Sequence, residues 1–566
     1  MKFSEIINFY LREIDSWTWF KVFINFLFYF AIIISEILFL TSFFLILNKE
    51  TGTEIINIFF SKLEFFVIQI FDNLSVTAVY ILILIIFLLL KNILSIFQLI
   101  FYNNFMFKLV VQKSSKLLSS YLLKTFEEFS KTDISIYTKQ LVRDVEGVFV
   151  GIFGLIITFT NELIYVIILI NFISHLVDFS PGIEVFLILV SMLVILYLLY
   201  IIAKKFGDLR ATSEIKVFKT LTDTLNVFKE IKIIQNSKDF ILRYKNYLGK
   251  YYKSRLASGV INIIPKFMFE FFLLLFFFVI YIGESENINI NDFVLKYSVF
   301  ALALLRLIPS FSKLSAYTST IIYSIASVKF INKDLIKKVY EEKEKKIKKK
   351  IVQQIKFKKV KLNFLLKNKS KKSIDNGFNF TFQTNKIYGI YGASGSGKTS
   401  ILNLLSGFIK PSSGSILING KEHKSNEITK KYNIGYAPQL STIIDEDVIT
   451  NVTLKYNNSS EVISKLKWYL LKFNLKKFTR KKYYNNNESL SIKNMSGGER
   501  QRIGFIRSVI NNPSLILLDE PTSSLDKENE QKIFTFLKSI KQDKIIIISS
   551  HNKNHKKYFD KVIDLN

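Results

Sequence analysis

The sequence predicts a helical membrane domain of six spans followed by an α/β nucleotide-binding domain. Three observations predict this order: long apolar stretches confined to the first 310 residues, a glycine-rich phosphate-binding motif from residue 392, and an apolar strand that ends in two carboxylates. The chain has 566 residues, 55 of them Phe, and its mean hydropathy of +0.27 is too high for an ordinary soluble protein. We therefore assign residues 1–330 to the membrane domain, 331–350 to a linker and 351–566 to the nucleotide-binding domain.

A bilayer-spanning helix needs about twenty largely apolar residues. Six stretches meet this requirement, at residues 20–47, 65–90, 148–176, 183–203, 265–282 and 292–309. Most Lys and Arg residues of this half lie in two long connections, 91–147 and 204–260. The positive-inside rule therefore places these connections, both termini and the nucleotide-binding domain in the cytoplasm. Apolar residues recur at helical spacing in both connections, which predicts that the membrane helices continue beyond the bilayer.

Composition excludes several kinds of partner, processing signal and covalent or metal site. Charged residues between Lys2 and Glu13 alternate with apolar ones, which indicates an amphipathic helix on the cytoplasmic membrane surface rather than a cleavable signal. The net charge of +31 comes from Lys spread along the whole chain together with abundant Asn and Ile, so we expect no nucleic-acid partner. The Lys-rich segment from Lys333 to Lys372 is typical of a solvated helix and linker, and contact with anionic lipid is the alternative. The chain has no cysteine, which excludes disulfides and thiolate metal sites.

The segment from Gly392 to Thr399 fits the phosphate-binding loop pattern, and it follows a short apolar strand, Ile387 to Tyr391. Glycines allow backbone N–H groups to surround phosphate oxygens, Lys398 can reach the β- and γ-phosphates, and Thr399 can hold Mg²⁺. The sequence thus predicts ATP and Mg²⁺ as cofactors. The residues expected to contact the nucleotide from this loop are Gly392, Ser394, Gly395, Ser396, Gly397, Lys398, Thr399 and Ser400.

A second part of the site is predicted where the apolar strand from Leu515 ends at Asp519 and Glu520. Asp519 fits a Mg²⁺ contact and Glu520 a general base for an attacking water, although such a pattern alone is more often a buried strand with an acidic turn. Here it follows the run Met495-Ser-Gly-Gly-Glu-Arg-Gln-Arg502. This combination resembles the ATP-binding cassette (ABC) ATPases.

That resemblance implies further roles. Gln439 resembles the glutamine that joins the Mg²⁺ and water site to the membrane domain, and His551 resembles the histidine that contacts the γ-phosphate. Phe364 corresponds to the aromatic residue that stacks on adenine, and the loop from Ser523 to Asp526 to one that crosses a dimer interface. The signature residues, which close over the nucleotide of a second cassette, are Ser496, Gly497, Gly498 and Glu499. Glu499 stands where glutamine is usual, and the preceding segment from Asn485 to Lys493 lacks the glycines that exporters of the family often carry.

Six spans with two long cytoplasmic hairpins before one cassette resemble the ABC exporter half-transporter, with a type IV exporter-like membrane domain. The resemblance implies a homodimer in which short coupling helices at the hairpin tips contact the cassettes. Those tips are expected near Phe126 to Ile136 and Asn226 to Ser237. A solvated helical turn is the alternative at either tip.

Basic residues at membrane depth are candidates for a substrate site because such charges are costly in lipid. They are Lys91, Lys266, Arg306 and Lys313, and Glu36, Glu162 and Glu270 could instead pair with them. The segments Pro265 to Glu270 and Ala303 to Ser310 look similar to the bacterial lipid-linked oligosaccharide flippases. That similarity implies an anionic, polyprenyl-pyrophosphate-linked glycan as substrate and membrane lipids as partners.

The sequence therefore predicts an ATP-driven exporter or flippase of the bacterial inner membrane, with its cassette in the cytoplasm. Two alternatives remain open. One is an exporter of peptides or drugs on the same architecture. The other is a non-transporting ABC channel or sensor, a class that often lacks the catalytic base that Glu520 represents here.

Overall fold

The computed structural model describes residues 3–47, 76–176, 183–284, 290–335, 349–366, 369–423, 425–456, 458–480 and 495–565. The chain forms two compact units. The helical unit comprises Met1–Leu123 and Thr132–Tyr340, and the cassette unit comprises Lys124–Lys131 and Glu341–Asn566. The first part of the second predicted span (65–75), most of the predicted linker and the segment from Asn485 to Lys493 lie outside the described residues.

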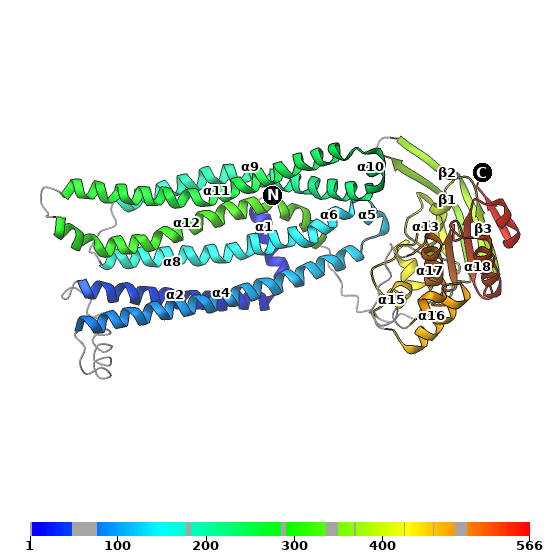
Figure 1. Cartoon of the computed structure of the whole chain (residues 1–566), viewed down its shortest axis with the longest axis horizontal. Coiled ribbons are helices and arrows are strands. Elements are labelled where there is room, and N and C mark those ends of the chain that lie inside the picture. The colour runs from blue at the N-terminus through cyan, green and yellow to red at the C-terminus, as the bar shows by residue number, and fades with distance from the viewer. Residues whose placement is uncertain are drawn as a thin grey trace. The chain divides into compact units, whose positions relative to one another are not determined.

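The helical unit is built from long helices that run side by side (Figure 1). In chain order they are α1 (Phe3–Glu13), α2 (Ser16–Leu47), α4 (Val76–Leu122), α6 (Ile134–Lys139), α7 (Val145–Val148), α8 (Leu155–Leu176), α9 (Ile183–Asn226), α10 (Phe228–Ile234), α11 (Ser237–Glu284) and α12 (Ile290–Leu335). Two π-helical segments, η1 (Gln140–Asp144) and η2 (Phe149–Gly154), join α6, α7 and α8 into one continuous rod. Helix α2 packs against α4, and α12 packs against α8, α9 and α11.

The predicted spans fall in these helices, and the helices extend well past them, as the periodicity of the long connections predicts. Among the described residues, three stretches are long and apolar enough to cross a membrane, at Ser16–Phe43, Ala78–Leu122 and Ile134–Phe172. Helices α9 and α11 are 44 and 48 residues long, about twice the length that a bilayer requires.

The N-terminal helix packs on the helical unit. Phe9 and Tyr10 on α1 are buried, and the Tyr10 ring stacks on Phe153 with a centroid distance of 5.5 Å. The Tyr10 hydroxyl donates a 2.7 Å hydrogen bond to the Val148 carbonyl. The helix is amphipathic as predicted, and part of its apolar face packs against η2. Its position on the membrane surface stays a prediction.

A short helix lies at each hairpin tip where the sequence analysis expects one. Helix α5 (Phe126–Ser130) begins at Thr125, whose side chain accepts a hydrogen bond from the Glu128 N–H. It belongs to the cassette unit, where the Phe126 ring lies 5.3 Å from the ring of Phe408. Helix α10 occupies the second tip, within the helical unit.

The cassette unit contains two sheets. The antiparallel sheet has the order β2-β1-β4-β5 and the parallel sheet the order β6-β7-β8-β3-β9. The strands are β1 (Gln354–Leu366), β2 (Lys369–Gln383), β3 (Lys386–Tyr391), β4 (Ser413–Ile418), β5 (Lys421–Glu422), β6 (Ile434–Ala437), β7 (Leu515–Asp519), β8 (Ile545–Ser550) and β9 (Lys561–Asp564). Strands β7 and β8 are fully buried, as expected for parallel strands covered on both faces.

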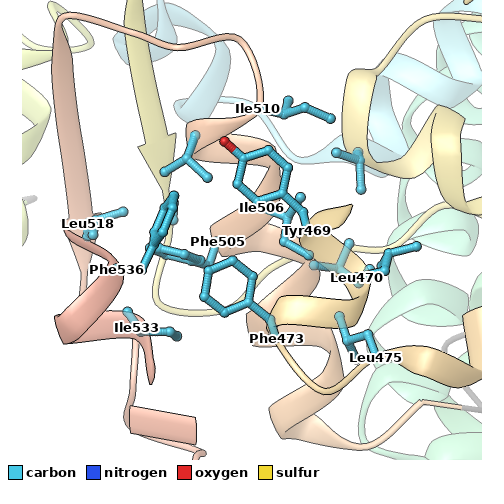
Figure 2. Close-up of a cluster of buried hydrophobic side chains, with 14 of the residues drawn as sticks. Tyr469, Leu470, Phe473, Leu475, Phe505, Ile506, Ile510, Leu518, Ile533 and Phe536 are labelled. Atoms are coloured by element: carbon cyan, nitrogen blue, oxygen red, sulfur yellow. The ribbon is translucent and has the colours of Figure 1, made fainter. Parts of the chain in front are cut away.

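Helices cover the parallel sheet. They are α13 (Lys398–Leu405), α14 (Ser425–Lys431), α15 (Val448–Thr453), α16 (Ser460–Lys472), α17 (Gly497–Val509) and α18 (Lys527–Ser539), with 3-10 turns η3 (Lys476–Thr479) and η6 (Lys553–Tyr558). Figure 2 shows the core beneath α17, where Phe505 lies between Phe473 and Phe536. The Phe505 ring is perpendicular to that of Phe473 at 5.1 Å. This packing fixes the signature helix to the strand that carries Asp519.

Candidate nucleotide-hydrolysis site

The phosphate-binding loop follows the buried strand β3 and leads into α13, as predicted. Gly395 and Gly397 have φ values of +82° and +100°, a region that side-chain-bearing residues rarely adopt. Lys398 is buried, and its Nζ donates hydrogen bonds to the carbonyls of Gly392 (2.9 Å) and Ala393 (3.0 Å). The ammonium is therefore held over the loop, next to the N-terminus of α13, where a phosphate group is stabilised by backbone N–H groups.

The loop fits a polyphosphate in a further respect. The Ser396 Oγ atom is buried and has no hydrogen-bond partner among the described residues. A Cβ added at Gly392 would lie 2.5 Å from this oxygen and 3.2 Å from Leu565 Cβ, so a side chain there would crowd the loop. The remaining predicted loop residues, Ser394 and Ser400, lie in the same turn and in the first turn of α13.

Asp519 meets Thr399 at the mouth of this loop. The Thr399 hydroxyl donates a 2.8 Å hydrogen bond to Asp519 Oδ2, although the two residues are 120 positions apart. Both groups present oxygen, which is the ligand type that Mg²⁺ prefers, so the pair fits the predicted metal contact. Burial beside the Asp519 carboxylate raises the pKa of Tyr436 to about 12, which keeps this neighbouring phenol neutral.

Glu520 lies at the centre of the predicted catalytic residues. Gln439 Nε2 donates a 3.0 Å hydrogen bond to Glu520 Oε2, and His551 Nδ1 lies 3.3 Å from Oε1. Lys398 Nζ is 3.9 Å from the same carboxylate. The structure thus brings Gln439, Glu520 and His551 together within reach of the phosphate-binding lysine, which is the geometry that activation of a water beside a terminal phosphate requires.

The signature residues form the N-terminus of α17. Ser496 accepts a hydrogen bond from the Glu499 N–H, and the Glu499 side chain accepts one from the Ser496 N–H, which makes a complete capping box. The unusual Glu499 therefore has a structural role, and Lys477 pairs with it at 2.6 Å. Ser496 and Gly497 are exposed, with Gly498 behind them next to Ser524.

Phe364 lies in β1, paired with Lys371 of β2. Its predicted contact with adenine stays a prediction.

Sequence reasoning missed two residues that organise the site. Gln501 Nε2 donates to the Glu520 carbonyl at 2.7 Å, and Ser549 Oγ donates to Asp519 Oδ1 at 2.5 Å. For Ser549 a signal was present, because it is the first hydroxyl after four consecutive isoleucines in β8. Gln501 is the one uncharged polar residue of the run Arg500-Gln-Arg502, and no motif spacing distinguished it.

The structure places three of the four predicted substrate residues around one cavity of the helical unit. Lys91, Arg306 and Lys313 line a space of about 570 Å³ between α2, α4, α8 and α12, together with Tyr29, Tyr102, Tyr165 and Tyr317. Lys266 does not line it. The Lys266 side chain is 55% exposed and lies 3.8 Å from Glu270 on the same helix. Because Lys266 is not part of the wall, the four residues do not form one lining.

Each cation of the cavity also has a carboxylate partner, as the alternative prediction allowed. Fully buried Glu36 pairs with Lys91 and with Arg306 Nε, the latter at 3.4 Å, and Glu162 pairs with Lys313 at 2.6 Å. Three cations thus face two carboxylates, which leaves one positive charge in the cavity. The Arg306 guanidinium also lies over the Phe39 ring, with its central carbon 5.0 Å from the ring centroid, and the side chain is 35% exposed.

Comparison with known proteins agrees with this site. Residues 376–523 match the family model described as ABC transporter. A probable ABC transporter ATP-binding/permease protein of Haemophilus influenzae is 36% identical over 185 residues, which cover 32% of this chain and 33% of that protein. The lipoprotein-releasing system ATP-binding protein LolD of Buchnera aphidicola is 39% identical over 188 residues, which cover 31% of this chain and 78% of that protein.

Structural similarity covers more of the chain than these sequence matches do. A bacterial Atm1-family ABC exporter solved with ATP bound covers 97% of this chain and 93% of its own, with a TM-score of 0.77 and 16% identity. At this identity the likeness shows the fold alone: a helical domain of exporter type followed by an ABC ATPase domain. The chain belongs to the ABC transporter family, and it carries the family's ATPase domain.

We expect Glu520→Gln to abolish ATP hydrolysis while ATP binding persists, because the amide keeps the shape of the side chain and cannot accept the proton of the attacking water. Phosphate release and nucleotide binding by purified protein measure the two effects. Glu461→Gln, on the exposed face of α16, is the matched control. Turnover of Glu520→Gln within about twofold of the native rate would show that Glu520 is not the base.

Lys398→Ala should remove most ATP affinity, because the polyphosphate loses a charge-assisted partner held in place by two loop carbonyls. Phe364→Ala should weaken binding less, since stacking on a base contributes only about 1–3 kcal/mol. Equilibrium binding of a fluorescent ATP analogue tests both, with Lys421→Ala on exposed β5 as control. Equal affinity in Lys398→Ala and the native protein would contradict the phosphate-loop assignment.

Proposed function

We propose, from its membership of the ABC transporter family, that this chain is one half of an ATP-driven exporter of the bacterial inner membrane. It acts as a homodimer, and its cassette lies in the cytoplasm. The observation that carries the proposal is the cluster of Gln439, Glu520 and His551 beside Lys398, on a chain whose first half has the exporter fold. The sequence matches to the curated relatives cover about a third of this chain, so transport itself is part of the proposal.

Hydrolysis follows from the positions of these side chains. Lys398 and the N–H groups at the start of α13 hold the phosphates, and Glu520 accepts a proton from the water that attacks the terminal one. Gln439 orients the Glu520 carboxylate through its amide, and His551 lies on the other oxygen. Bound Mg²⁺ would neutralise phosphate charge, with Thr399, Asp519 and Gln439 as the residues to hold it.

Two features support a homodimer. Ser496 and Gly497 expose the N-terminus of a 13-residue helix to solvent, a position that stabilises a phosphate brought by a second cassette. In addition, the tip helix α10 exposes Phe228, Ile233 and Ile234 by 55%, 81% and 71%, and apolar side chains of this size at a hairpin tip favour a protein contact.

For the substrate, we propose an amphiphile whose anionic head group enters the cavity of the helical unit, with a polyprenyl-pyrophosphate-linked glycan as the specific candidate. Arg306 supports this, because its side chain lines the cavity and a guanidinium binds phosphate oxygens in a bidentate manner. The surplus of one cation over the carboxylates supports it as well. Ser95, Gln98, Thr158 and Asn161 supply further polar groups in the wall.

An exporter of peptides or drugs is the second candidate, and the four tyrosines of the cavity favour it, because aromatic faces accept many apolar ligands. ATPase stimulation in nanodiscs separates the two. Stimulation by pyrophosphate lipids favours the first, and stimulation by apolar peptides or drugs favours the second. A non-transporting channel or sensor predicts stimulation by neither, and the intact geometry around Glu520 argues against that class.

Arg306→Ala should abolish flipping of a pyrophosphate-linked glycan in proteoliposomes while basal ATPase activity remains. In this variant Lys91 still pairs with Glu36, so the buried Glu36 carboxylate keeps a cationic partner. Arg306→Lys should retain part of the activity, because it keeps the charge and loses the bidentate contact. Lys266→Ala is the matched control, since that side chain lies outside the cavity. If Arg306→Ala flips the glycan at the native rate, the substrate assignment fails and the exporter proposal stands alone.

A further inference from the structure

Ser549 lies at a junction of the parallel sheet that carries the hydrolytic site. It is the fifth residue of β8, where it aligns with Asp519 of β7 on one side and with Ile390 of β3 on the other. Its side chain is completely buried. The four residues before it in β8, Ile545 to Ile548, are isoleucines that pack in the apolar core, so a hydroxyl at this depth requires a polar partner.

The hydroxyl has two partners, and both belong to the site. Ser549 Oγ donates to Asp519 Oδ1 at 2.5 Å and accepts a 2.9 Å hydrogen bond from the Glu520 N–H. A hydroxyl has a single hydrogen, so the bond to Asp519 uses it and a lone pair receives the N–H. One side chain therefore connects the carboxylate that faces Thr399 with the backbone of the residue that acts as base.

Glu520 needs such support because its backbone is unusual. Its φ is +45°, in the left-handed region that residues with a side chain rarely adopt because it is strained. The conformation persists where neighbours hold it, and here Ser549 binds the N–H while Gln501 binds the carbonyl at 2.7 Å. The two hydrogen bonds fix the peptide groups on both sides of the Glu520 Cα, and thereby the direction of its side chain.

We propose that Ser549 is a positioning residue for ATP hydrolysis, which locks the Asp519 carboxylate and the Glu520 backbone in one arrangement. With Oδ1 held by Ser549, the second oxygen of Asp519 is directed at Thr399. With its N–H held, Glu520 presents its carboxylate to Gln439 and His551. The inference rests on the ATPase domain and is independent of any substrate of the helical unit.

Removal of the Ser549 hydroxyl should lower Mg²⁺ binding and hydrolysis but leave ATP binding without Mg²⁺ nearly unchanged. Ser549→Ala leaves the Glu520 N–H buried without a partner and lets the Asp519 carboxylate rotate. Loss of an outer contact that orients a metal-binding residue typically lowers metal affinity or activity by about 10- to 100-fold, and we expect a fall of this size in kcat and in apparent Mg²⁺ affinity. The affinity for ATP measured in EDTA should change by less than about twofold, because Lys398 and the loop N–H groups are untouched.

The experiment compares Ser549→Ala, Ser549→Thr and Ser514→Ala in the full-length protein. Ser549→Thr keeps the hydroxyl and should recover most of the activity. Ser514 is a buried serine at the start of neighbouring β7 whose Oγ accepts from the Val352 N–H, away from the site, so its alanine variant controls for loss of a buried hydroxyl in this sheet. The readouts are kcat, Mg²⁺ titration of nucleotide binding, ATP affinity in EDTA, and the melting temperature.

A double-mutant cycle with Asp519→Asn separates positioning from packing. If Ser549 acts through Asp519, Ser549→Ala should weaken Mg²⁺-dependent nucleotide binding in the native protein and have little further effect in Asp519→Asn. The proposal is overturned if Ser549→Ala lowers the melting temperature no differently from Ser514→Ala and leaves kcat and Mg²⁺ affinity unchanged. It is also overturned if Ser549→Ala weakens nucleotide binding equally in the native protein and in Asp519→Asn. The same holds if Ser549→Ala lowers the ATP affinity in EDTA as much as the ATP affinity with Mg²⁺.

Discussion

The parallel register of strands β3, β7 and β8 is the constraint on which the rest of the cassette depends. Parallel strands end at one edge of a sheet, so the residues that follow each of them meet there although they are far apart in sequence. The register aligns Tyr391 with Ser550 and Asp519 with Ser549. The phosphate-binding loop, the two carboxylates and His551 therefore converge. A shift of one residue in the register of β7 would move the Asp519 side chain to the opposite face of the sheet and separate it from Thr399.

A second constraint governs the helical unit, where each buried charge needs a partner of opposite sign before any of these charges can bind a ligand. Glu36 is completely buried, and an isolated carboxylate at such depth is prohibitively costly, so its two cationic partners are first of all a condition of folding. What distinguishes the cavity is the imbalance of three cations to two carboxylates. Arg306 pairs with Glu36 and stays 35% exposed, and Lys313 pairs with Glu162 and stays 52% exposed. A compensated charge network can thus still present cations to a ligand.

Sequence patterns predicted the fold and singled out the segments that meet at the candidate site, because each of these signals is local in the chain. A phosphate-binding loop is eight consecutive residues, and Asp519 and Glu520 directly follow their strand, so their chemistry can be read before the fold is known. The contacts of Ser549 and Gln501 depend on neighbouring strands and on one φ angle, which no spacing along the chain encodes. The same limit explains Lys266: its predicted depth is similar to that of Arg306, but its side chain is not among those that line the cavity. For α1, periodicity revealed an apolar face and could not reveal that part of it packs against η2.

The tip helix α5 extends this reasoning to the link between the two halves of the chain. Its residues lie far from the cassette in sequence, yet they belong to the cassette unit. Phe126 contacts Phe408, and Phe408 meets Tyr436 of β6 edge to face at 5.5 Å. Tyr436 is half-buried near Asp519. Gln439 follows Tyr436 by three residues and donates a hydrogen bond to Glu520. A series of aromatic contacts therefore joins a segment of the first half of the chain to β6, the strand that precedes Gln439. The sequence predicts a contact between this hairpin tip and the cassette, and the packing of Phe126 on Phe408 supplies one that periodicity along the chain could not specify.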